Sequence, residues 1–118
     1  MESILTSIKK MLGLAEEYEH FDADIIMCIN AVFADLAQIG VGPAEGFYIE
    51  DETSVWTDFI PDLTKLQSVK TYMFLRVKLL FDPASVGSST LASYERQIAQ
   101  WEWRLNVEAE SAKSNETT

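Results

Sequence analysis

Apolar residues in the first third of the chain recur every three or four positions, which is the spacing of a helix. The first run predicts a short helix over residues 4–12 that Gly13 ends. The second run predicts a helix over residues 22–39, with Asp22 as its N-terminal cap and Gly40 after its end. The apolar residues of this second helix cover more than one narrow stripe, so we expect it to lie in the middle of the fold with neighbours on two sides.

A short β-hairpin is predicted between the second and third helices. Residues 47–49 (FYI) and 54–56 (SVW) both favour β-structure, and they flank the polar tetrapeptide 50–53 (EDET). An isolated two-stranded hairpin is marginal in water. We therefore expect it to pack its apolar residues against a helix or to pair with another chain.

Two further helices and a tail complete the predicted fold. The third helix covers about residues 62–81, Asp82-Pro83 stops it, and a flexible loop follows over residues 84–90. The fourth carries one apolar stripe, at Leu91, Tyr94, Ile98, Trp101 and Leu105. The predicted fold class is mainly α, a small bundle of about four helices with one β-hairpin. Residues 1–107 form its domain, and residues 108–118 form a disordered acidic and polar tail.

Trp103 does not fit the apolar stripe of the fourth helix. Side chains two positions apart on a helix point about 200° apart, so Trp101 and Trp103 need different surroundings. Either the hairpin or the first helix covers Trp103, or Trp103 contacts another copy of the chain, because tryptophan and arginine are enriched at interface hot spots. The second alternative predicts a subunit contact made by Trp103, Arg96 and Val107 together with Tyr48 or Trp56.

The composition is that of a soluble globular protein, with 47% hydrophobic and 24% charged residues. Asp and Glu number 19 against 9 Lys and Arg, which gives a net charge of −10. Because such a surface repels a phosphate backbone, ordinary or sequence-specific DNA binding is not expected. No apolar run reaches the roughly 18 to 20 residues of a membrane span, and the N-terminus lacks the basic start of a signal peptide. The expected place is the cytosol in which the chain is made.

No pattern in the chain points to an enzyme, a cofactor or a metal. The single histidine, His20, and the single cysteine, Cys28, cannot form a zinc site by themselves, and Cys28 is expected to be a small buried hydrophobe. The glycine-rich stretch 40–46 lacks the Lys-Ser/Thr ending of a phosphate loop. The acidic residues 50–52 are consecutive and not at the alternating positions of a calcium loop. We therefore predict no catalytic, cofactor-binding or metal-binding residues.

Three segments in this order, INAVFADLAQIGVGP, SVKTYMFLRVKLLFDP and ERQIAQWEWRLN, resemble small head-tail connector (adaptor) proteins of tailed bacteriophages and prophages. The resemblance covers nearly all of residues 1–109, although ASVGSS replaces the proline-rich loop usual after FDP. It implies a helical structural protein that assembles as a ring below the portal and extends the DNA channel, so that DNA passes through its lumen. The implied partners are copies of the chain, the portal protein and a tail-completion or stopper protein. The implied location is the head-tail junction of the virion, after synthesis in the host bacterial cytoplasm.

A function of another class stays open. A small acidic regulatory or anti-defence protein could bind a basic host protein by imitating nucleic acid. Such a mimic needs closely spaced carboxylates along one long face. In this chain the acids concentrate in predicted loops, at helix starts and in the tail, which favours the connector.

Overall fold

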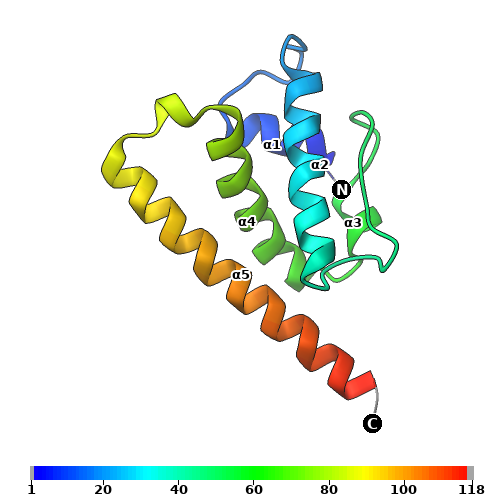
Figure 1. The fold of residues 1–118 in the computed structure, drawn as a ribbon. Coiled ribbons are helices and arrows are strands. Elements are labelled where there is room, and N and C mark those ends of the chain that lie inside the picture. Colours follow the sequence, from blue (N-terminus) through cyan, green and yellow to red (C-terminus); the bar gives the residue numbers. More distant parts are fainter. Residues whose placement is uncertain (1, 117–118) are drawn as a thin grey trace.

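The computed structural model describes residues 2–116, and within this range it contains five α-helices and one 3₁₀ helix (Figure 1). The mainly helical fold that the sequence predicts is confirmed. The elements are α1 (Ile4–Met11), α2 (Asp22–Gln38), α3 (Trp56–Phe59), α4 (Leu63–Phe81), η1 (Pro83–Ser85) and α5 (Ser88–Glu116).

Helices α2 and α4 form the centre of the bundle. Helix α1 packs on α2, and α5 packs on α4 and projects beyond the other helices toward the C-terminus (Figure 1). The prediction that the second helix has neighbours on two sides is therefore confirmed. Its buried side chains, which form the middle of the core, are Ile25, Ile29, Val32, Phe33 and Leu36.

The predicted helix ends are correct for three helices, but the predicted cap of α2 is wrong. Asp62 caps α4 by accepting a hydrogen bond from the Thr64 N–H at 2.9 Å. Asp22 is the first residue of α2, after the N-cap residue Phe21, and it makes no capping bond. Its carboxylate instead lies 2.9 Å from the ammonium of Lys9, which is buried in α1. A buried ammonium without a partner costs folding free energy, so pairing with Lys9 determines where the Asp22 carboxylate lies.

The predicted β-hairpin is wrong. Residues 2–116 contain no strand, and the only β-bridge in that range is an isolated one between Ser3 and Val55. Both backbone hydrogen-bonding groups of Ile49 are bonded to the side chain of Asn30, so they are not available to a second strand. The second β-favouring segment bonds to the N-terminus, where the Ser54 carbonyl accepts from the Ile4 N–H at 3.0 Å, and then enters α3.

The last helix is longer than predicted at both ends. The expected loop over residues 84–90 is shortened, because η1 covers Pro83–Ser85 and α5 begins at Ser88. Toward the C-terminus, α5 crosses the predicted domain end at residue 107 and continues to Glu116. Ala109 packs against the core, and this contact favours helix where the sequence predicted a disordered tail. The division into a domain and a separate tail stays a prediction. Residues 117 and 118, the last two of the predicted tail, lie outside the described range.

Candidate interaction surfaces

Trp103 lies on the outer face of α5 with 68% of its surface exposed. The predicted stripe faces inward as expected, since Ile98 and Trp101 are half-buried and Leu105 is buried against the core. Neither α1 nor the 47–56 segment covers Trp103, so the explanation in which the chain itself covers this side chain is wrong. A large aromatic left in water on a folded surface is a candidate contact for another molecule.

The surroundings of Trp103 form a surface that we call the Trp103 face. Trp103 lines a shallow hollow together with Ala99, Gln100 and Arg104. Arg96 is exposed two turns earlier on the same side of α5, and Val107 is partly exposed one turn later. The face therefore comprises Arg96, Ala99, Gln100, Trp103, Arg104 and Val107, and it includes two arginines.

The two predicted contact residues of the 47–56 segment have opposite surroundings. Tyr48 is 66% exposed and is therefore available to another chain. Trp56 is fully buried, and its indole Nε1–H donates to the Ser7 hydroxyl at 2.8 Å. Because a buried side chain cannot reach another copy of the folded chain, the prediction of Trp56 as a subunit contact is wrong. The structure places Trp56 in the core, where the ring of Phe33 packs edge-on against it.

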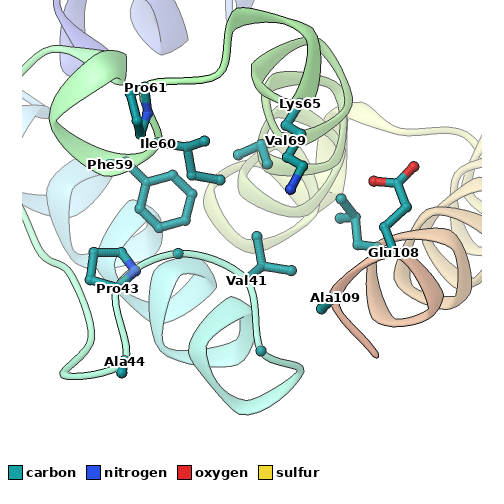
Figure 2. A pocket seen from close by; sticks show the side chains of 13 residues that line it. Val41, Pro43, Ala44, Phe59, Ile60, Pro61, Lys65, Val69, Glu108 and Ala109 are labelled. Carbon is teal, nitrogen blue, oxygen red and sulfur yellow. The ribbon is translucent and has the colours of Figure 1, made fainter. Parts of the chain in front are cut away.

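An apolar pocket of about 570 Å³ lies where the α2–α3 loop, the α3–α4 junction and α5 meet (Figure 2). We call it the 40–44 pocket. Val41, Phe59 and Val69 form apolar walls, and the charged side chains of Lys65 and Glu108 lie at its rim. Sequence reasoning missed this pocket, because its walls come from three segments that are far apart in the chain. The complete lining is Gly40, Val41, Gly42, Pro43, Ala44, Phe59, Ile60, Pro61, Lys65, Val69, Leu105, Glu108 and Ala109.

A polar network fixes α5 against the two central helices. Arg76 of α4 donates to Asp35 of α2 at 2.6 Å and to the hydroxyl of Tyr72 at 2.7 Å. The Tyr72 hydroxyl in turn donates to Glu102 of α5 at 2.7 Å. Burial, together with this bond to Glu102, raises the pKa of Tyr72 to about 12. The network orients α5 and thereby holds Trp103, the residue after Glu102, away from the bundle.

The residues with the greatest potential for chemistry are dispersed. His20 is exposed and its ring packs edge-on against Phe21, with centroids 4.7 Å apart. Cys28 is half-buried against the core, and burial raises the pKa of its thiol. Across residues 2–111, whose side chains the structure describes, no three or more His, Cys, Asp or Glu side chains are grouped so that they could hold a metal ion. Within the same residues, no helix has both the length and the apolar character needed to cross a membrane.

Comparison with known protein families gives one match. The family described as "Phage connector protein" matches residues 4–112, nearly the whole chain. The chain belongs to this family. The resemblance to phage head-tail connectors is thus confirmed. Phage connector proteins are structural virion components that associate with other phage head and tail proteins, and they are not known as an enzyme family. No curated protein and no solved structure matches the chain significantly.

Proposed function

We propose that this phage connector protein assembles as a homo-oligomeric ring below the portal, extends the DNA channel and joins head to tail. The ring meets the portal protein on one side and a tail-completion or stopper protein on the other, after synthesis in the host bacterial cytoplasm. The observation that carries the proposal is an uncovered Trp103 face in a chain whose family is the phage connectors. The alternative function, a small acidic regulatory or anti-defence protein, is not supported by a family match.

Assembly into a closed ring needs two different contact patches on each copy. In such a heterologous contact, a patch on one copy meets a different patch on the next copy. Trp103, Arg96 and Val107 belong to one exposed patch on α5, and Tyr48 is exposed on a different segment. The chain therefore offers exposed aromatic residues on two separate elements.

The net charge suits a conduit for DNA. A wall with a charge of −10 per copy repels phosphates, so DNA can slide through without being held. The acidic residues of loops 16–19 and 50–52 are exposed, and they are available to a channel surface. This supports passage of DNA without sequence-specific binding.

The test is the native mass of the full chain across a wide concentration range, with and without the portal protein of the same phage. We expect large closed species, and we expect Trp103→Ala to reduce them while the unfolding midpoint of the monomer stays nearly unchanged. A hot-spot aromatic contributes about 2 kcal/mol or more to association. The matched control is Met27→Ala, because Met27 on α2 is similarly exposed (71%) and lies on a different helix. A chain that remains monomeric and does not bind the portal would contradict the proposal.

A further inference from the structure

We propose that Trp103 of one copy inserts into the 40–44 pocket of the next copy. This inference rests on the proposed assembly into a ring, and it names the two surfaces that make the subunit contact. The donor surface is the Trp103 face of α5. The receiving surface is the pocket between the α2–α3 loop, the α3–α4 junction and the inner side of α5.

The two surfaces lie on opposite sides of the same helix. Leu105 and Ala109 line the pocket, whereas Trp103 points away from both, by about 160° and 120° respectively. A copy therefore cannot fill its own pocket with its own Trp103. Each copy can use both surfaces at once, one toward each neighbour, and this is the requirement for a ring of heterologous contacts.

The pocket suits an indole. Its lining is mainly apolar. Phe59 and Val69 in this lining are buried, and the partly exposed Pro43 and Ile60 are apolar side chains that an indole can contact. A volume of about 570 Å³ accommodates a whole aromatic side chain and leaves room for its neighbours.

Charge complementarity favours a second copy as the occupant. Copies with a net charge of −10 repel one another unless opposite charges meet locally. Arg96 lies two turns before Trp103 on the donor surface, and Arg104 lines the hollow at Trp103 while its guanidinium lies 5.1 Å from the centre of the Trp101 ring. On the receiving side, Glu108 lies at the pocket rim and Glu45 is exposed beside Ala44. The donor surface also carries a negative charge, Glu110 on the outer part of α5, and the pocket rim carries a positive charge, Lys65. These two residues allow a second ion pair between copies.

The experiment mixes two variants of the full chain that lack opposite halves of the contact. Trp103→Ala keeps the pocket but lacks the donor, and Ala109→Trp keeps Trp103 but fills the pocket from its own helix. We expect each variant alone to be monomeric, with the helical circular dichroism of the wild type. We expect an equal mixture to form dimers of one copy of each variant and nothing larger, by native mass spectrometry.

A cross-linking measurement keeps the test valid if Ala109→Trp does not fold. In a Cys28→Ala background, one chain carries Gln100→Cys beside Trp103 and another carries Ala44→Cys at the pocket rim. A short bis-maleimide should link the two chains when mixed, and should link neither variant to itself. The link should disappear when Trp103→Ala is added to the Gln100→Cys chain, and the control pair Met27→Cys with Ala44→Cys should give none.

The outcomes separate this inference from the proposed function. If the wild type forms a ring but the Gln100→Cys chain links only to copies of itself, or does not link to the Ala44→Cys chain, the inference is wrong. The proposed ring is unaffected by that result. A ring of unchanged mass in the pocket variants, with Ala44→Cys linked to the portal protein, would assign the pocket to the portal and overturn the inference as well. A wild-type chain that is monomeric with and without portal would overturn both.

Discussion

The side chain of Asn30 forms hydrogen bonds with both backbone polar groups of Ile49, 19 positions later in the chain. Its Nδ2 donates to the Ile49 carbonyl at 3.0 Å, and its Oδ1 accepts from the Ile49 N–H at 2.8 Å. A neighbouring β-strand would satisfy the same two groups. One asparagine on α2 thus replaces the second strand of a hairpin, keeps Ile49 in the core and leaves Tyr48 at the surface.

Removal of the Asn30 side chain should destabilise the fold. We expect Asn30→Ala to lower the free energy of unfolding by about 2 to 6 kcal/mol, because two backbone groups near the core lose their partners at about 1 to 3 kcal/mol each. Urea denaturation measures the loss. The control is Asn106→Ala, whose side chain makes one long contact of 3.5 Å with the Ile39 carbonyl and should cost less than about 1 kcal/mol. Equal losses in the two variants would contradict the role of Asn30.

The ion pair between Lys9 and Asp22 should be important for stability. The Lys9 side chain is almost fully buried, donates to the Glu16 carbonyl at 2.7 Å and has Asp22 as its only carboxylate partner among the described residues. Asp22→Asn should cost about 2 to 3 kcal/mol, somewhat below the range for a fully buried pair, because Asp22 is partly exposed to solvent. Asp24→Asn, in the same first turn of α2 but exposed, should cost about 0.5 kcal/mol. Thermal unfolding at neutral pH compares Asp22→Asn with Asp24→Asn. Similar losses of stability in the two variants would show that Asp22 acts only through the helix dipole.

The pocket wall depends on the absence of a side chain at Gly42. Gly42 and Gly46 have nearly the same positive φ, +92° and +91°. A Cβ at Gly42 would overlap the ring of Phe59, whereas a Cβ at Gly46 would meet nothing within 4 Å. Both changes place an alanine at a positive φ, and the overlap with Phe59 should make Gly42→Ala cost about 1 to 3 kcal/mol more than Gly46→Ala. Denaturation curves of Gly42→Ala and Gly46→Ala, measured side by side, test this difference. Equal stabilities would mean that the Phe59 ring moves aside freely.

Tyr72 should make the stability of the protein fall in alkaline solution. Its pKa is raised from 10.0 to about 12 by burial and by its bond to Glu102, so the folded state holds the phenol proton more tightly than the unfolded state does. The stabilisation is therefore complete below pH 10 and is lost as the pH rises to 12, by about 2 to 3 kcal/mol.

The variant Tyr72→Phe separates this effect from other alkaline titrations. It should lose about 1 to 2 kcal/mol at neutral pH through the missing hydrogen bonds. Its stability should also decrease less steeply than that of the wild type between pH 10 and 12, because it lacks the phenol whose proton the folded state holds more tightly than the unfolded state does. Urea midpoints at several pH values provide the measurement. If the stabilities of the wild type and of Tyr72→Phe fall equally steeply with pH, Tyr72 is not the group responsible for the alkaline loss of stability.

The candidate contact surface was only partly predictable. Helix geometry alone requires Trp101 and Trp103 to face different surroundings, and Trp103 is indeed the side chain outside the core stripe. The pocket that we assign to it had no sequence signal, because Val41, Phe59 and Leu105 come together only when three separate segments pack.

The positions of α1, α2 and α4 were determined by the sequence itself, whereas α3 was not predicted and α5 is longer than predicted. Apolar spacing, Asp62, Gly13 and Gly40 act within a few residues, so α1, α2 and α4 match their predicted ranges to within one residue at each end. Only the tertiary structure decided the course of residues 47–56 and the surroundings of Trp56. The partners that control them, Asn30 and Ser7, lie 19 and 49 positions away, and contacts at that separation exist only after the helices have packed. The β-propensity of residues 47–56 is a weak preference, and the buried hydrogen bonds of the packed fold outweigh it.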